Sequence, residues 1–390
     1  MSAQDNIVFS LFLIFSGAAI LSTVALWTRQ SLLVGYMILG LILGPSVLNW
    51  FSDASEISQI GEIGIIFLLF LLGLHLEPQN LLHMFRKATG VALVSSLVFM
   101  ALGVIVARIF SFTWPESWII GAAMMFSSTI IGLKLLPTTI LHHQHTGEVM
   151  ISVLLMQDLI AIISLVLLQG EQLGGVSLST ILLLIIALPA LLLVAFIMER
   201  WILRPLLARF DQVQEYLFLI AIGWCLGMAE LATLFKLSAE IGAFIGGVAI
   251  AASPIARFIA ESLKPLRDFF LVMFFFAVGA EFDIFSLKII IIPALVLTAI
   301  TILVKPWTFK YLLRWSGESK KVSWEAGVRL AQGSEFSLLL ASMAAGSQII
   351  SNNAFSLIQA MTMLSFIISS YWVVMRYPTP LAFKENLRRD

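Results

Sequence analysis

Apolar runs long enough to cross a bilayer recur along almost the whole of this 390-residue chain. A helix of about 20 apolar residues spans the hydrocarbon core, and hydrophobic residues make up 60% of the sequence against 12% charged residues. This balance excludes a soluble globular protein and predicts an all-α polytopic membrane protein. The net charge of zero suggests no nucleic-acid partner. We predict about thirteen transmembrane helices, at 7–27, 32–49, 57–76, 88–111, 116–136, 147–169, 176–198, 213–234, 238–253, 267–281, 286–308, 322–345 and 353–375.

The basic residues predict the orientation of these helices. Short cytoplasmic loops retain Lys and Arg, and one alternate set of loops holds most of them, whereas the opposite set holds little beyond Arg108, Lys236 and Lys288. We therefore expect a multi-pass protein of the plasma (inner) membrane with its N-terminus outside and its C-terminus cytoplasmic. The first apolar segment is too long for a cleavable signal and lacks a basic start, so it is predicted to be the first span.

An internal repeat is visible at a displacement of about 206 residues. The segment 70–77 (FLLGLHLE) matches 276–283 (FAVGAEFD), and 121–129 falls on 327–335. The paired spans lie an odd number of spans apart, so the two copies run in opposite directions, as in many secondary transporters. We predict an extra N-terminal helix at 1–30, a first inverted repeat at 31–205, a second at 206–376 and a cytoplasmic tail at 377–390.

Polar segments interrupt two spans at equivalent positions of this repeat. They are 126–129 (FSST) and 332–335 (QGSE). Corresponding interrupted helices of two inverted halves cross near the middle of the membrane in such transporters, and hydroxyl and amide groups can satisfy the backbone freed by unwinding. We predict two crossed discontinuous helices, with Ser127, Ser128 and Thr129 among the ion-binding residues. The alternative is an ordinary helix contact between small residues.

A carboxylate and an amide, Asp158 and Gln157, lie in the middle of the apolar run 147–169. A full negative charge in hydrocarbon is costly and is rarely kept there without a use. A buried carboxylate can hold either a proton or a monovalent cation, and this competition is sufficient for exchange. We predict that Asp158 binds K⁺ or Na⁺ and H⁺ in turn, with Gln157 as a further ligand and no resident cofactor. The alternative is a protonated structural aspartate.

Other polar residues in the spans are candidates for counter-charge, gating or structural roles. We predict counter-charge and gating roles for Lys305, Arg329, Glu335 and Gln332, with Arg329 favoured as a structural clamp on the interrupted helix or on Glu335. For Lys305 the alternative is snorkelling to the headgroups. Glu62 and Glu240 could line an ion funnel or be acids at headgroup level. A cluster of three histidines, at 142, 143 and 145, could bind metal or sense pH, but a solvated loop is favoured.

With these motifs in view, the chain resembles the monovalent cation:proton antiporters, in particular the Kef-type potassium/proton branch, over nearly its whole length. The segment 153–158 (VLLMQD) is similar to V-L-L-F-Q-D of that branch, and 332–336 (QGSEF) is similar to Q-G-[GS]-E-F. The segment 237–244 (LSAEIGAF) resembles its L-S-x-E-x-G-A-F. Two residues depart from the family pattern: His75 replaces the usual acid of the third span, and Met156 replaces a phenylalanine.

The resemblance implies a sodium/proton antiporter-like fold and a homodimer, in which a static domain supports a core that moves like an elevator. It also implies that Lys305 pairs with Asp158 in the ion-free state. Electrogenic relatives carry two adjacent acids where this chain has Gln157 and Asp158, so electroneutral exchange is expected unless Lys305 also releases a proton. Kef systems usually continue into a cytoplasmic nucleotide-binding regulatory domain. These residues contain no glycine-rich nucleotide motif, and no regulatory ligand is assigned to them.

Potassium/proton exchange through Asp158 is therefore the first functional hypothesis. Sodium/proton exchange is the second, because one aspartate and a few oxygens do not determine the size of the ion. A ligand-gated potassium efflux channel is an alternative of another class. An enzyme is not expected, because the histidines lie apart from Ser127 and Ser334 and no second mid-span aspartate accompanies Asp158.

Overall fold

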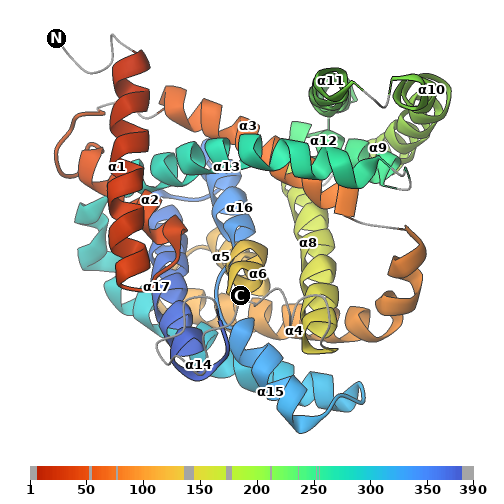
Figure 1. Cartoon of the computed structure of the whole chain (residues 1–390). Coiled ribbons are helices and arrows are strands. Elements are labelled where there is room, and N and C mark those ends of the chain that lie inside the picture. Colours follow the sequence, from red (N-terminus) through yellow and green to blue (C-terminus); the bar gives the residue numbers. More distant parts are fainter. Residues whose placement is uncertain are drawn as a thin grey trace. The chain divides into compact units, whose positions relative to one another are not determined.

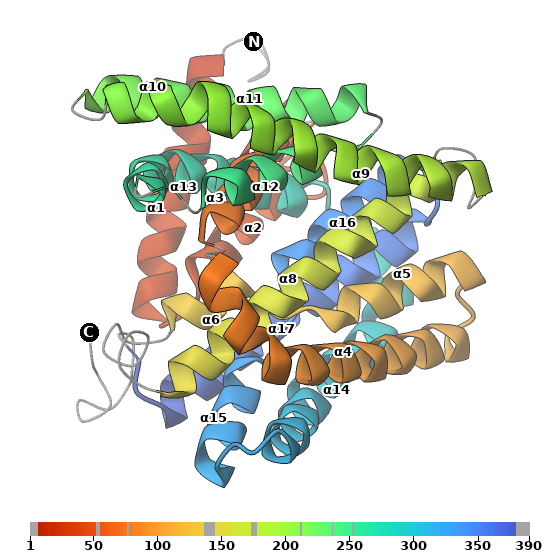
Figure 2. The same ribbon diagram turned by 90° about the vertical axis from the view of Figure 1, so that its right-hand side faces the viewer.

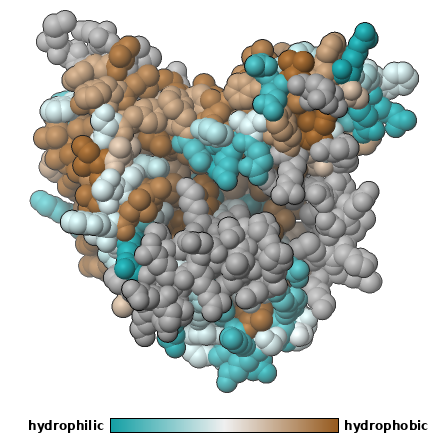
Figure 3. All heavy atoms as spheres, in the orientation of Figure 1, coloured by the Kyte–Doolittle hydropathy of each residue, from teal (hydrophilic) through white to brown (hydrophobic). Residues whose placement is uncertain are grey.

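The computed structural model of the chain describes residues 7–51, 55–75, 78–135, 145–172, 178–210, 213–235, 237–251, 253 and 255–379. Every regular element in these ranges is a helix (Figure 1). Many apolar side chains on the helices are exposed, as lipid-facing residues would be, and Figure 3 shows brown, hydrophobic atoms over the outer side of the N-terminal helix. The predicted all-α membrane fold is confirmed.

By length and composition, seven helices in the described ranges can cross a membrane. Shorter apolar helices accompany them, at Leu32–Leu43, Ile60–Leu74, Ala239–Ile250 and Glu335–Gly346. The prediction of about thirteen spans thus includes segments that are too short to qualify as uninterrupted spanning helices. The predicted spans 116–136 and 322–345 are interrupted by residues that are not helical, at 126–128 and 330–334, so neither forms one long helix.

The chain forms two compact units, and each unit draws on both halves of the sequence. The first comprises Met1–Asp53, Met84–Ser164 and Val278–Asp390, and the second comprises Ala54–His83 and Leu165–Ala277. The repeat boundaries at 31–205 and 206–376 stay predictions.

The first unit contains the interrupted helices. In it, α5 packs against α16, and α14 packs against α15 and α17. Figures 1 and 2 show α6 and α16 each beginning near the middle of this unit. Its helices are α1 (Ile7–Trp27), α2 (Leu32–Leu43), most of α4 (Pro78–Ile109), α5 (Trp114–Met125), α6 (Thr129–Lys134), most of α8 (His145–Gln172), α14 (Leu287–Trp315), α15 (Lys320–Arg329), α16 (Glu335–Gly346) and α17 (Asn352–Arg376).

The second unit is built around a close contact between two helices, α3 and α12. A Cβ atom on Gly73 of α3 would overlap the carbonyl oxygen of Phe244, and one on Gly247 of α12 would overlap that of Phe70. Glycine at both positions lets the two backbones touch. The helices of this unit are α3 (Ser55–His75), α9 (Leu178–Met198), α10 (Arg204–Arg209), α11 (Gln214–Leu234), α12 (Ala239–Ile250) and α13 (Ala256–Ala280) as far as Ala277, with a π-helical turn at Glu199–Leu203.

The first unit has a contact of the same kind between α2 and the end of α13. A Cβ atom on Gly279 would overlap the carbonyl oxygen of Met37, and one on Gly44 would lie 2.8 Å from the Cα and carbonyl oxygen of Ala280. The predicted repeat exchanges α2 with α12 and α3 with α13. The two contacts therefore have the pattern that an inverted repeat predicts.

Replacing Gly247 by Ala is expected to destabilise the second unit, because the added methyl must push α12 away from the α3 backbone. Overpacking of this kind costs about 1–3 kcal/mol. The matched control is Gly227→Ala on α11, where nothing lies within 4 Å of the added Cβ, so its stability should be unchanged or slightly higher. Thermal unfolding of the purified protein in detergent measures both. Equal melting temperatures for the two variants would contradict the close contact.

Candidate ion-binding site

The two interrupted helices meet inside the first unit. After α5 the chain is extended at Phe126, and α6 begins at Thr129; α16 likewise begins at Glu335, a few residues after α15 ends. The backbone N–H of Ser128 donates to the carbonyl of Gly333 at 2.8 Å, and the Ser127 hydroxyl donates to the carbonyl of Leu330 at 2.9 Å. Backbone groups freed by the two interruptions therefore satisfy one another in part.

Hydroxyl groups also satisfy the starts of both downstream helices. Ser128 Oγ accepts a hydrogen bond from the N–H of Ile131 at 3.1 Å, and Ser334 Oγ accepts one from the N–H of Phe336 at 3.1 Å. These are N-cap bonds, and the two serines occupy equivalent positions of the predicted repeat. Of the hydroxyls predicted as ion ligands, that of Ser127 thus joins the two interruptions, and that of Ser128 caps α6. Their role toward an ion stays a prediction.

Asp158 of α8 lies beside the start of α6. Its carboxylate accepts hydrogen bonds from Thr129 Oγ1, at 3.3 Å for Oδ1 and 3.2 Å for Oδ2, and the residue is 2% exposed. The preceding side chain fixes α8 to the end of α5, because Gln157 Nε2 donates to the carbonyl of Met125 at 3.0 Å. Gln157 Oε1 is buried without a hydrogen-bond partner. A carboxylate and a free carbonyl oxygen are thus adjacent in sequence and both buried.

A second buried carboxylate, Glu335, belongs to the same site. One of its oxygens, Oε1, accepts from the N–H of Ile130 at 3.4 Å, and the other, Oε2, is buried without a partner. The carboxyl groups of Glu335 and Asp158 are close enough to interact electrostatically. The two acids are far apart in sequence, and the meeting of the interrupted helices brings them to adjacent residues, Thr129 and Ile130. Oxygen-rich sites of this kind suit hard cations.

Lys305 of α14 bridges the two interruptions. Its ammonium donates to the carbonyl of Phe126 at 2.7 Å and to that of Gln332 at 3.1 Å, and it lies 5.1 Å from the ring centroid of Phe99. The side chain is fully buried, so the snorkelling alternative is wrong. The part of the chain that the structure describes contains no ion pair between Lys305 and Asp158. The pairing implied by the resemblance is thus not seen in this conformation.

Helix α17 supports the second interruption, which the sequence analysis did not anticipate. Ser369 Oγ donates to Gln332 Oε1 at 3.1 Å, and Ser365 Oγ accepts from the N–H of Gly333 at 2.8 Å. Gln332 Nε2 also donates to the carbonyl of Ser128 at 3.4 Å. The available signal was a stripe of polar side chains spaced three or four residues apart along an apolar helix, at Ser356, Gln359, Thr362, Ser365 and Ser369.

Arg329 holds the ends of three elements together and does not contact Glu335. It pairs with Glu325 on the preceding turn of α15 at 3.0 Å, donates to the carbonyl of Leu135 after α6 at 3.0 Å, and donates to that of Pro378 after α17 at 2.9 Å. The favoured reading, a structural clamp on an interrupted helix, agrees with these contacts. Four hydrogen bonds to fixed partners leave the guanidinium little freedom to move toward the ion site.

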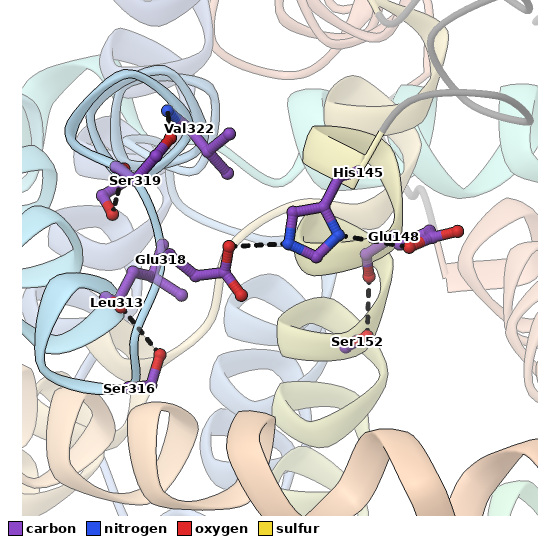
Figure 4. A network of polar contacts seen from close by, with 9 residues as sticks. His145, Glu148, Ser152, Leu313, Ser316, Glu318, Ser319 and Val322 are labelled. Atoms are coloured by element: carbon purple, nitrogen blue, oxygen red, sulfur yellow. Dashed lines mark hydrogen bonds and ion pairs between the residues drawn. The ribbon is translucent and has the colours of Figure 1, made fainter.

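The remaining predicted residues lie elsewhere. Glu62 of α3 and Glu240 of α12 belong to the second unit and interact electrostatically with each other; their role as an ion funnel stays a prediction. His142 and His143 lie outside the described residues. His145 begins α8, with Nδ1 3.3 Å from Glu148 Oε2 and Nε2 2.6 Å from Glu318 Oε2 (Figure 4). No group of three His, Cys, Asp or Glu residues in the described ranges could hold a metal ion.

Comparisons with known proteins match most of the chain. The family model described as "Sodium/hydrogen exchanger, transmembrane" matches residues 12–375. K(+) efflux antiporter 6 of Arabidopsis thaliana is 27% identical over 365 residues, which are 91% of this chain and 59% of that protein. Iron transporter MagA of Paramagnetospirillum magneticum is 26% identical over 348 residues, which are 88% of this chain and 80% of that protein.

A solved structure also has this fold. The sodium proton antiporter MjNhaP1 from Methanocaldococcus jannaschii, at pH 8, superposes with a TM-score of 0.72 and 17% sequence identity. The match covers 94% of this chain and 96% of that structure. The predicted antiporter-like fold is confirmed by this likeness.

Proposed function

The chain belongs to the sodium/hydrogen exchanger family, a family of transporters, and from this premise we propose that it exchanges potassium for protons across the membrane. Asp158 binds the cation and the proton in turn. The observation that carries the proposal is a set of buried oxygens around Asp158 that lack hydrogen-bond partners. Gln157 Oε1 and Glu335 Oε2 are buried without hydrogen-bond partners, and leaving such groups unpaired costs about 1–3 kcal/mol each. A dehydrated cation would supply the missing interactions.

Potassium is favoured over sodium by the similarity to a plant protein named as a K(+) efflux antiporter and by the Kef-type motifs around Asp158 and Glu335. This chain spans 59% of that relative, so the activity of the whole relative is carried over only as a proposal. Sodium/proton exchange is the runner-up, because the oxygens of the site do not determine the radius of the ion.

The experiment that tests the proposal is proton release in proteoliposomes that contain the purified protein. External K⁺, Rb⁺ or Na⁺ is added, and the internal pH is followed with a fluorescent dye. We expect K⁺ and Rb⁺ to drive proton movement at lower concentrations than Na⁺. A response to Na⁺ alone would contradict the potassium assignment. Ion flux at channel rates without proton movement would favour a potassium efflux channel.

We propose that the exchange follows an elevator mechanism in a homodimer of the plasma (inner) membrane. The support is that both interruptions, Asp158 and Lys305 all lie within the first unit and are joined by mutual hydrogen bonds, so that they can move as one body. One cation is exchanged for one proton at Asp158, beside the uncharged Gln157, which makes the exchange electroneutral. A transport rate that depends strongly on membrane voltage would contradict this stoichiometry.

Replacing Glu335 by Gln is expected to weaken cation binding without abolishing exchange. Gln keeps an oxygen that can accept from Ile130, so the start of α6 remains capped, but a charged ligand is lost. A hydrogen bond or contact to a charged group is worth about 1.5–3 kcal/mol, so the half-saturating K⁺ concentration should rise about tenfold or more. The control is Glu230→Gln, an exposed acid of α11, which should leave this concentration unchanged. If Glu335→Gln has wild-type half-saturation, Glu335 is only a helix cap.

A further inference from the structure

The junction between α14 and α15 carries an excess of positive charge. Lys310 and Arg314 lie one turn apart on α14, and Lys320 and Lys321 begin α15; all except the half-buried Lys310 are exposed. We name these four side chains the basic junction. They gather within a stretch of twelve residues, 310–321.

In the part of the chain that the structure describes, the two acids near the basic junction are engaged by other residues. Figure 4 shows the Glu318 carboxylate directed at His145, where the two side chains approach to 2.6 Å. Glu325 accepts from Arg329 Nε at 3.1 Å and from Nη2 at 3.0 Å. The four basic side chains have no ion pair among the described residues. Figure 3 shows a hydrophilic surface over α15.

Aromatic side chains border the basic junction on the α14 side. Trp307, Tyr311 and Trp315 recur every four residues on one face of α14, with exposed fractions of 47%, 63% and 82%. The ring of Trp307 contacts that of Trp324 of α15 at 5.1 Å, and Lys310 Nζ lies 3.9 Å from the Trp307 centroid. Tryptophan and tyrosine in such positions are typical of the headgroup level of a bilayer. The cation–π contact holds the Lys310 ammonium at this level.

Within the described ranges, the start of α15 also lacks a compensating negative charge. Ser319 caps the helix by accepting from the N–H of Val322, and the first turn contains two lysines and no acid. The amino-terminal end of a helix carries partial positive charge, so Lys320 and Lys321 are unfavourably placed unless an anion lies beside them. Backbone N–H groups of a first turn are suited to bind a phosphate oxygen.

We propose that the basic junction binds the phosphate headgroup of an anionic phospholipid. The phosphate neutralises the lysines at the start of α15, and the glycerol and acyl chains pack along the exposed aromatic face of α14. A membrane lipid fits better than free phosphate, because Tyr311 and Trp315 expose apolar surface next to the charges. Clusters of basic residues immediately beside a transmembrane helix are a recognised feature of anionic-lipid binding.

The test is a lipid titration of the purified full chain in neutral detergent, read by native mass spectrometry. Phosphatidylglycerol is compared with phosphatidylcholine, and the variant is Lys320→Gln with Lys321→Gln. Each basic residue near a membrane surface adds about 1 kcal/mol to the binding of anionic lipid, which is about fivefold. We expect tighter binding of phosphatidylglycerol to the wild type, and a loss of about 25-fold in the double variant.

A matched control removes the same charge from another surface. Arg200→Gln with Arg209→Gln changes two exposed arginines near the end of α9 and in α10, outside the basic junction, and should lose much less affinity for phosphatidylglycerol than the lysine variant. A second variant, Trp315→Ala, changes an 82% exposed side chain and should also weaken the lipid complex. The proposal is overturned if the lysine variant binds like the wild type or if the control loses as much. Equal thermal stabilisation by inorganic phosphate and by phosphatidylglycerol would overturn the lipid assignment.

Discussion

Proteoliposomes that contain Asp158→Asn are expected to show no cation-driven proton movement above protein-free liposomes. Asn cannot bind and release a proton in the physiological range, so cation and proton no longer compete for the same atom. The substitution should leave the protein folded, because the Asn side-chain oxygen can still accept from Thr129 Oγ1, which lies 3.2–3.3 Å from the carboxylate oxygens. Removing a buried charge is itself favourable. Stability should therefore be equal to that of the wild type or higher.

The same variant should lose stabilisation by the transported ion. A ligand that binds only the folded protein adds stability that grows with its concentration, to about 2.7 kcal/mol at 100 times the dissociation constant. We expect K⁺ to raise the melting temperature of the wild type and not that of Asp158→Asn, with choline as the control for ionic strength. Potassium flux that survives in Asp158→Asn would contradict the exchanger and favour a channel, in which the aspartate only attracts cations.

The sequence was sufficient to predict the elements of the site and not their partners. The polar segments at 126–129 and 332–335 are visible because polar residues in the middle of apolar spans are expensive, and the structure joins these segments as predicted. The sequence does not show which hydrogen bond each side-chain hydroxyl makes. Ser127 and Ser128 direct their hydroxyls to the carbonyl of Leu330 and the N–H of Ile131. Each hydroxyl can cap a helix, bridge two segments or bind an ion, and spacing alone does not distinguish these uses.

Two long-range relations explain most of the remaining differences. The sequence predicts gating for Glu335 and ion binding for Asp158, whereas the fold places their carboxyl groups in one site. The sequence does not predict a role for the serines of α17, because a serine in a membrane helix commonly bonds to its own backbone. Only the packing of α17 on the second interruption shows that Ser365 and Ser369 bond to Gly333 and Gln332. The repeat in the sequence related equivalent positions to each other, but it carried no information about α17.

Replacing Lys305 by Met is expected to produce the largest loss of stability in the first unit. The carbonyls of Phe126 and Gln332 both accept from the ammonium, and Met leaves them buried without this donor. Each unsatisfied buried acceptor costs about 1–3 kcal/mol, so a loss of about 2–6 kcal/mol is expected. The melting temperature in detergent measures it. Lys305→Arg, which keeps a charged donor, should retain part of this stability and is the matched control.

Lys305 can act as a hydrogen-bond bridge between the two interruptions or as the counter-charge of Asp158. A double-mutant cycle, which measures the interaction free energy between Lys305 and Asp158, distinguishes these two roles. If Lys305 mainly bridges the interruptions, the stability losses of Lys305→Met in the wild type and in Asp158→Asn should agree within about 0.5 kcal/mol. If the two residues form an ion pair in the ion-free protein, Asp158→Asn should rescue much of the loss, because a lone buried charge is more costly than none. The stabilities are measured without K⁺, because the ion pair is expected in the ion-free protein. A coupling above about 1 kcal/mol under those conditions would show that the carbonyl-bound lysine is only one of two positions that the side chain adopts.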